Sequence, residues 1–272
     1  MAVTFVAFSD PHVNSYVGLV PAGQFEHAGG IHKPNTGQRF IARNFQKFAD
    51  EVERVAEKSK SSGIVTVLNG DACDMHPKTT ALISYSHTTM MRMTYEAIKP
   101  IVNLSDQMYL TVGTKSHTGH FEHKIAEDIG AVPANETAGL WAHDNLKLEI
   151  AGCRIWAQHH GRMGGLFHTE RNAANTLAAH TISETNGERL PHLVLASHQH
   201  RWADSGDNYQ EYGVRAIFLA GWQLPTGYIN QIKRNARGQI GGLIAVIEDG
   251  QMVSAHKFRV KVAPSRTIRV VL

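Results

Sequence analysis

Hydrophobic and polar residues recur along the first half of the chain with two different periods. Alternating or continuous apolar runs predict strands, and apolar residues three or four positions apart predict amphipathic helices. Strand and helix patterns alternate, which is typical of an α/β protein with a largely parallel core sheet. The predicted strands are residues 3–9, 64–68 and 108–112, and the predicted helices are residues 41 to about 60, 83–102 and 121–129.

The second half of the chain is richer in strand patterns. Residues 146–157 predict two strands around Ala151-Gly152, and a helix is expected at 171–184. Four further strands are expected, namely one at 193–195, one from Val214, and a C-terminal pair joined by a hairpin turn at Asp249-Gly250. No repeat, low-complexity tract or Pro-rich linker separates the halves. We therefore expect a single domain, residues 1–272, with two sheets packed on each other.

Composition narrows the class of protein. A 272-residue chain that is 42% hydrophobic can bury a full core. It contains no run of about 18 apolar residues, so no membrane span is predicted. The N-terminus has no signal-peptide pattern, and two cysteines are too few for a disulfide scaffold. These features predict a cytoplasmic protein. The net charge of +3 permits an acidic partner but is weak evidence for one. The 17 histidines are an unusually high number, and they matter because histidine binds transition metals.

Aspartates and histidines follow five of the predicted strands. In chain order they are Asp10 and His12, then Asp71 and Asp74, then His117, then His159 and His160, and finally His198 and His200. The carboxyl ends of strands in an open α/β sheet converge on one crevice, so these side chains are expected to meet. Imidazole nitrogen with carboxylate oxygen is the donor set of a transition-metal site.

Each motif also has a structural interpretation when taken alone. A D-x-H sequence is common, and an Asp after a strand is often a helix cap or turn former, which is the favoured interpretation for Asp74 by itself. The coincidence at five strand ends is what favours a metal site. His198 and His200 are therefore expected to be ligands.

The order of these motifs resembles that of the calcineurin-like metallophosphoesterase family. The family pattern is D-x-H, G-D-x-x-D, G-N-H-[DE], a lone His, and G-H-x-H. The corresponding stretches here are residues 10–12, 70–74, an altered 113–119, 159–161 and 197–200. The resemblance implies a four-layer α-β-β-α sandwich, two mixed sheets flanked by helices, that carries two divalent metal ions. Mn²⁺ is the first choice, with Fe, Zn²⁺, Ni²⁺ or Mg²⁺ as alternatives.

The resemblance also implies a role for each residue. The implied ligands are Asp10, His12 and His200 for one metal, Asp71 as the bridge, and His198 with either His159 or His160 for the other. If the segment at 159–160 is still extended, one of the two adjacent histidines points inward and the other outward. Asp74 would orient a ligand by hydrogen bonding and would not bind metal itself.

The third motif departs from the family pattern. Thr114 stands where the family has an Asn ligand, and His117 comes two residues later than the family's acid. His117 could replace the acid, replace the ligand, or do neither, and we expect the acid. The variant G-T-x-x-H-x-G and the later H-H-G-R-M-G-G resemble phage and prophage members of the family.

The resemblance implies hydrolysis of phosphate mono- or diesters. Two metal ions would activate a water for in-line attack, and His117 would protonate the leaving oxygen. Lys115 and Arg162 are candidates for holding the phosphate. A DNA nuclease or a nucleotide phosphatase fits the phage-like motifs, although no basic run with interleaved aromatics indicates nucleic acid. Residues 14–37 have no clear period, and this expected long loop either covers the crevice or is a surface insertion.

Two alternatives use the same residues differently. The chain could be a catalytically impaired scaffold of this fold that binds a protein partner, or it could hold one structural metal. The intact Asp and His motifs argue against the scaffold, which has no need for buried charges. The basic stretch 257–262 is as well explained by a sheet edge guarded by lysines. The oligomeric state is not indicated.

Overall fold

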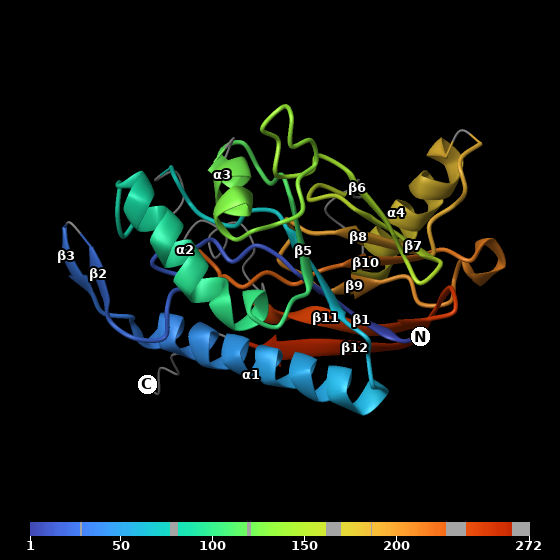
Figure 1. The fold of residues 1–272 in the computed structure, drawn as a ribbon, viewed down its shortest axis with the longest axis horizontal. Coiled ribbons are helices and arrows are strands. Elements are labelled where there is room, and N and C mark those ends of the chain that lie inside the picture. Colours follow the sequence, from blue (N-terminus) through green and yellow to red (C-terminus); the bar gives the residue numbers. More distant parts are fainter. Residues whose placement is uncertain are drawn as a thin grey trace, which may run out of the picture.

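Two five-stranded β-sheets pack face to face, and helices lie on their outer faces (Figure 1). The structure is a computed structural model. It describes residues 1–27, 29–76, 81–118, 121–161, 170–185, 187–226 and 238–262.

The first sheet has the strand order β12-β11-β1-β4-β5. Its parallel core is β1 (Val3–Phe8), β4 (Ile64–Asn69) and β5 (Gln107–Thr111). The two strands on the other side of β1 are antiparallel to their neighbours, and they are β11 (Gln239–Glu248) and the edge strand β12 (Gln251–Lys261). The turn between them is at Asp249-Gly250, as predicted.

The second sheet has the order β6-β7-β8-β10-β9 and is also mixed. Its three central strands are parallel, and they are β7 (Cys153–Ala157), β8 (Leu193–Ala196) and β10 (Arg215–Phe218). Antiparallel edge strands complete it, and they are β6 (Leu146–Ile150) and β9 (Ala203–Asp204).

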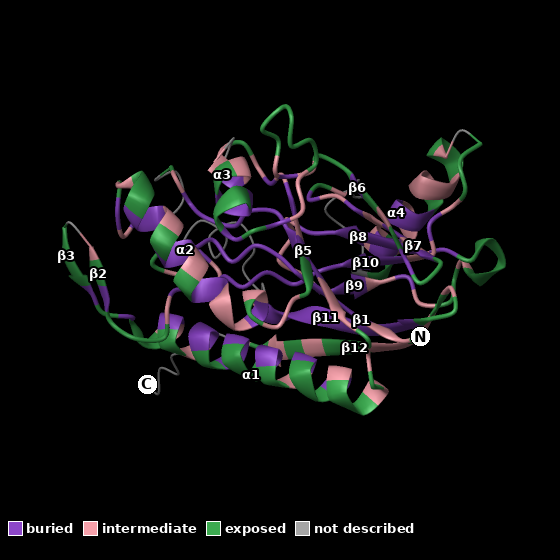
Figure 2. Ribbon diagram, viewed as in Figure 1, coloured by how far each residue is buried: buried purple, intermediate pink, exposed green. Residues whose placement is uncertain are grey.

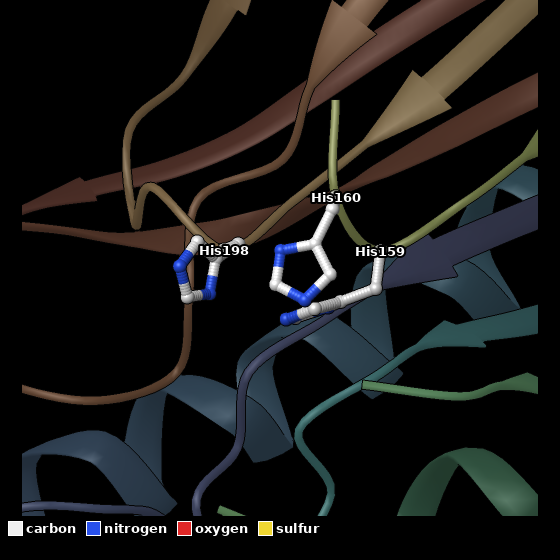
Figure 3. A group of neighbouring side chains, drawn as sticks. All are labelled: His159, His160 and His198. Atoms are coloured by element: carbon white, nitrogen blue, oxygen red, sulfur yellow. The ribbon is translucent and has the colours of Figure 1, made fainter. Parts of the chain in front are cut away.

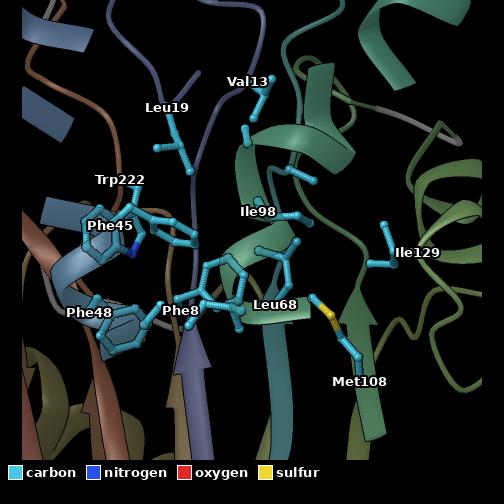
Figure 4. Packing of buried hydrophobic residues seen from close by; sticks show 14 of the residues in the cluster. Phe8, Val13, Leu19, Phe45, Phe48, Leu68, Ile98, Met108, Ile129 and Trp222 are labelled. Atoms are coloured by element: carbon cyan, nitrogen blue, oxygen red, sulfur yellow. The ribbon is translucent and has the colours of Figure 1, made fainter. Parts of the chain in front are cut away.

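Alternation along β1 and β4 produces separate hydrophobic layers. Val6, Phe8 and Leu68 pack under the helices α1 (Thr36–Ser59), α2 (His87–Val102) and α3 (Phe121–Asp128) (Figure 4). Phe5 and Ala7 point the other way, into the layer between the sheets. A third cluster lies between the second sheet and α4 (Glu170–Glu184). The α1 helix therefore has a buried face and an exposed face (Figure 2). The predicted four-layer sandwich is confirmed.

Local capping sets where the helices start. Asn35 and Gln38 form a capping box at the start of α1, and the left-handed Lys60 (φ 50°) ends it. The α2 helix starts four residues later than the predicted residue 83, because the Ser86 hydroxyl accepts the amide of Thr89 and fixes the first turn there.

Residues 14–37 were predicted as a loop, and that prediction is wrong in part. They contain a two-stranded hairpin, β2 (Phe25–His27) with β3 (Gly30–His32), which projects at one end of the molecule (Figure 1). Strands of three residues are too short for an alternating pattern to be visible. The sequence also missed β9 and a short 3-10 helix, η1 (Gln210–Tyr212), for the same reason.

The register of the strands brings the polar motifs to one edge of the fold. Phe8 pairs with Leu68, and Asn69 pairs with Thr111, so β1, β4 and β5 end at the same level. The Asn69 amide donates to the Gln158 carbonyl and to Ser197 Oγ, and so ties the end of β4 to the loops after β7 and β8. Within the described residues, no helix is long and apolar enough to cross a membrane. The cytoplasmic location stays a prediction.

Candidate metal centre

Loops from both sheets bring six of the sequence-predicted ligands together. The donor atoms form two overlapping groups, all within 4.8 Å of one another inside each group. The groups are Asp10, His12 and His200, and Asp10, Asp71, His159 and His198. Because the groups share Asp10, they are neighbouring parts of one centre.

The first group surrounds Asp10 Oδ1. His200 Nε2 lies 3.2 Å from this oxygen, and His12 Nε2 lies 3.8 Å from it. Asp10 Oδ1 is fully buried and accepts no hydrogen bond from the part of the chain that the structure describes. A buried carboxylate oxygen without a donor is costly unless a cation compensates it. The position therefore fits a metal ion.

The second group surrounds Asp71 Oδ2. His159 Nε2 lies 3.0 Å from this oxygen, and His198 Nδ1 lies 3.8 Å from it. His12 Nε2, from the first group, is also 3.8 Å away. The other oxygen, Asp71 Oδ1, accepts the Thr114 backbone amide at 2.6 Å. Asp71 Oδ2 thus lies between the two groups of imidazoles.

Outer contacts orient two of the imidazoles. Asp74 Oδ1 lies 2.7 Å from His12 Nδ1, and the Asn69 carbonyl lies 2.8 Å from His159 Nδ1. Each contact turns the Nε2 atom of its histidine toward the carboxylates, as outer partners of metal-binding histidines do. Asp74 therefore lies where the sequence predicted an orienting residue.

The backbone is strained at the same positions. Nine described residues other than glycine have positive φ, and five of them are candidate ligands. Their φ values are 52° for Asp10, 42° for His12, 51° for Asp71, 69° for His198 and 50° for His200. Left-handed conformations cost about 1 kcal/mol or more per residue and cluster at functional sites. This concentration supports a functional centre over a purely structural one.

Two glycines allow the loops to approach the candidate ligands closely. A Cβ at Gly70 would lie 2.4 Å from His159 Nδ1, and Gly70 itself has φ +79°. A Cβ at Gly113 would lie 2.3 Å from the Asp71 amide nitrogen and 2.4 Å from Asp71 Oδ1. No side chain can be added at either position without moving a candidate ligand.

The altered third motif also lies at the centre. His117 Nδ1 lies 2.9 Å from Asp74 Oδ1, and its ring packs edge-on against the His12 ring at 4.7 Å. The His117 side chain remains 21% exposed, so it can be reached by a bound molecule. Lys115 is exposed, and Arg162 lies outside the described residues.

His159 and His160 do not alternate as residues of a strand would. β7 ends at Ala157, and the next residues bend. His159 is buried and His160 is exposed, yet both imidazoles face the ring of His198 (Figure 3). The expectation that one would point away does not apply, because the segment is no longer extended there.

Charges at the centre compensate one another. Burial raises the pKa of Asp10 and Asp71, but neighbouring imidazoles, chiefly His200 and His159 respectively, outweigh burial and hold both pKa values below the usual range. Burial lowers the pKa of His159, but the two carboxylates raise it to about 9. A metal ion binds the unprotonated form of an imidazole, so metal binding at His159 would release a proton.

Glu122 is a neighbour of the centre that the sequence reasoning missed. Its carboxylate is fully buried and accepts the backbone amides of Gly113 and Ala72. Burial, and then the charge of Asp71, raise the pKa of Glu122 to about 8. Glu122 thus holds two of the loops together. A glutamate in the first turn of a helix is ordinary, so the sequence carries no signal for this contact.

No protein-family model and no curated protein matches the chain. Several solved structures are similar to it. A phosphatase from Mycoplasma pneumoniae is 9% identical with a TM-score of 0.42, over 96% of this chain and 94% of that one. The phosphoesterase YfcE of E. coli is 10% identical with a TM-score of 0.36, over 94% of this chain and 99% of that one. A Vps29 mutant from Entamoeba histolytica is 10% identical with a TM-score of 0.39, over 97% of this chain and 100% of that one. Likeness at this level does not establish a family, so the chemistry has to come from the side chains.

Proposed function

We propose that this protein is a metal-dependent phosphoesterase with two adjacent divalent ions. The observation that carries the proposal is the position of Asp71 Oδ2 between two groups of imidazoles, 3.0 Å from His159 and 3.8 Å from both His12 and His198. The orphaned Asp10 Oδ1 supports the first ion in particular. The proposed ligands are Asp10, His12 and His200 on one side, Asp71 as the bridge, and His159 and His198 on the other.

Two bound divalent ions supply positive charge against phosphate oxygens and an acidified water for in-line attack. The chain supplies the rest. His117 protonates the leaving oxygen, since its Nδ1 is fixed by Asp74 and its partly exposed ring lies beside His12. Asp74 holds both rings through one oxygen and so couples the proton donor to a ligand.

The proposed substrates are phosphate mono- or diesters, with a nucleotide or DNA as the leading candidates from the motif variants in the sequence. Mn²⁺ remains the first choice of metal, although mixed carboxylate and imidazole donors also suit Fe, Zn²⁺ and Ni²⁺. We propose that residues 1–272 act as one domain, since the two groups of ligands come from both sheets.

The test is a panel of activated aryl mono- and diesters, nucleotides and DNA, assayed after chelation and after reloading with Mn²⁺. We expect hydrolysis only in the reloaded protein, and none with Asp71→Asn. Asp204→Asn, at a partly buried aspartate away from the centre, is the matched control and should hydrolyse the same substrates. Equal inactivity of chelated and reloaded wild-type protein across the panel would favour the non-catalytic scaffold.

A further inference from the structure

Three imidazoles, and not two, converge on the second position. The donor nitrogens of His159, His160 and His198 all lie within 4.8 Å of one another. Their ring centroids are 4.8 Å apart for His159 and His160, 4.5 Å for His160 and His198, and 5.3 Å for His159 and His198. Figure 3 shows the imidazole rings of His159, His160 and His198 as neighbours.

One hydroxyl lies among these nitrogens and cannot satisfy them all. Thr114 Oγ1 is 3.3 Å from His159 Nε2, 3.4 Å from His160 Nε2, 3.1 Å from His198 Nδ1 and 3.1 Å from Asp71 Oδ2. A hydroxyl has one hydrogen to donate. The hydroxyl hydrogen can therefore serve only one of these four atoms. Thr114 alone does not fill the position that Asp71 Oδ2 and the three nitrogens surround.

The proposed donors lie near the spacing that one ion requires. Donors held at about 2.0–2.1 Å in a tetrahedral arrangement lie roughly 3.3 Å from one another. Asp71 Oδ2 is 3.0 Å from His159 Nε2 and 3.8 Å from His198 Nδ1, and the three nitrogens lie within 4.8 Å of one another, so small ring movements bring them to that spacing. The chain around His160 is also closely packed, because a Cβ at Gly161 would lie 2.6 Å from Ala196 Cβ and 2.7 Å from Phe218 Cζ.

We propose that His160 is a third imidazole ligand of the second metal position, beside His159 and His198. It supplies the donor that Thr114, with only a neutral hydroxyl, supplies poorly. The proposal rests on the two-metal centre proposed above, but it does not depend on that centre being catalytic.

The proposal makes the two positions chemically different. The first position has two imidazoles, His12 and His200, with oxygens from Asp10 and Asp71. The second has three imidazoles and, as its assigned carboxylate, the shared Asp71. Imidazole-rich sets favour ions late in the Irving–Williams order, whereas carboxylate-rich sets suit Mn²⁺. The second position should therefore take Zn²⁺ or Co²⁺ in preference to Mn²⁺, more strongly than the first.

The experiment measures metal binding directly. Chelator-treated protein is titrated with Zn²⁺, Co²⁺ and Mn²⁺ by calorimetry, and with Co²⁺ also by visible absorption, and bound ions are counted by elemental analysis. Wild type should bind two ions. His160→Ala should keep one and bind the second at least about 100-fold more weakly, because losing even an outer partner of a ligand costs about 10–100-fold. His256→Ala, on the exposed edge strand β12, is the matched control and should bind like wild type.

Two additional variants keep the test specific. Thr114→Asn carries an amide oxygen to the place of the hydroxyl, so it should recover much of the second affinity in the His160→Ala background. Thr114→Val in the same background has no such oxygen and should recover none. Circular dichroism checks that each variant is folded.

The outcomes separate the two proposals. Unchanged binding of both ions by His160→Ala would overturn the role of His160 alone. Equal preference of both wild-type positions for Zn²⁺ over Mn²⁺ would also overturn it, without any variant. A wild-type protein that binds a single ion would overturn the two-metal function and this inference with it.

Discussion

Two clusters of charged side chains in this molecule are built around aspartate, and they differ in how the carboxylate oxygens are used. In the Asp204 cluster, formed by Asp204, Arg215 and Lys257, every carboxylate oxygen has donors. Asp204 Oδ1 accepts from Arg215 Nε at 3.0 Å and from the Gly206 amide at 2.8 Å. Asp204 Oδ2 accepts from Arg215 Nη2 at 2.8 Å and contacts Lys257 Nζ at 2.6 Å. This cluster is complete as it stands, and it links β9 and β10 of one sheet to β12 of the other.

The metal centre has the opposite character. Among the described residues Asp10 Oδ1 is buried without a hydrogen-bond donor, imidazole rings pack against other imidazole rings, and the backbone is left-handed at five candidate ligands. Asp204, by contrast, lies in a strand with no positive φ. A cluster of charged side chains therefore does not by itself indicate a metal site. Unsatisfied acceptors together with strained backbone at one place do indicate one.

The largest effect on the metal centre is expected for Asp71→Asn. An amide at this position cannot bridge two cations as a carboxylate does, so we expect metal binding to collapse and turnover of every ester to fall to background. Elemental analysis and a rate assay measure the two effects together. Retained metal and retained turnover in this variant would show that the two groups of ligands are not joined through Asp71.

The next largest effect is expected for His117→Ala. If His117 is the acid, esters with poor leaving groups should slow by about 10²–10⁴-fold, whereas activated aryl esters should barely slow, because only poor leaving groups need the proton. Metal content should remain that of wild type. A uniform slowing of all esters together with lost metal would instead make His117 a ligand, and unchanged rates would leave it without either role.

A smaller effect is expected for Gly113→Ala. The added carbon would lie 2.3 Å from the Asp71 amide nitrogen, so the loops must move apart, at a cost of about 3 kcal/mol in the free energy of unfolding. Metal affinity should fall too, because Asp71 is displaced. Gly23→Ala, where the added carbon meets nothing within 4 Å, is the control and should change neither quantity. Equal denaturation midpoints for the two variants would contradict the close approach at Gly113.

The sequence predicted most of this fold because its signals are local. Apolar periods identified β1, β4 and α1, and the alternation of strand and helix placed the strand ends, and hence Asp10 and Asp71, at one edge. What the sequence could not provide depends on contacts between distant loops. The Glu122 contacts join helix α3 to two loops, and the direction of the His160 ring depends on a bend after β7 that the sequence pattern does not predict. Whether the predicted ligands bind metal stays a prediction.

The smallest effect is expected for Asp204→Asn. It should lower stability and leave metal binding unchanged, unlike a substitution at the metal centre. Arg215 and Lys257 are 27% and 39% exposed, so solvent screens the pair and we expect a loss of about 1–2 kcal/mol at pH 7. Burial raises the pKa of Asp204, but hydrogen bonds from Arg215 and Lys257 outweigh it and lower the pKa.

A lowered carboxyl pKa gives stability that is present above the unfolded value, about 3.9, and is lost as the pH falls through the folded value. The difference in free energy of unfolding between wild type and Asp204→Asn should therefore be full at pH 7 and shrink below about pH 4. Urea denaturation of both metal-free proteins at several pH values measures it, with metal content at pH 7 as the second readout. A difference independent of pH would mean that the lost contacts are not ionic. A loss of bound metal would mean that the Asp204 cluster supports the centre and is not independent of it.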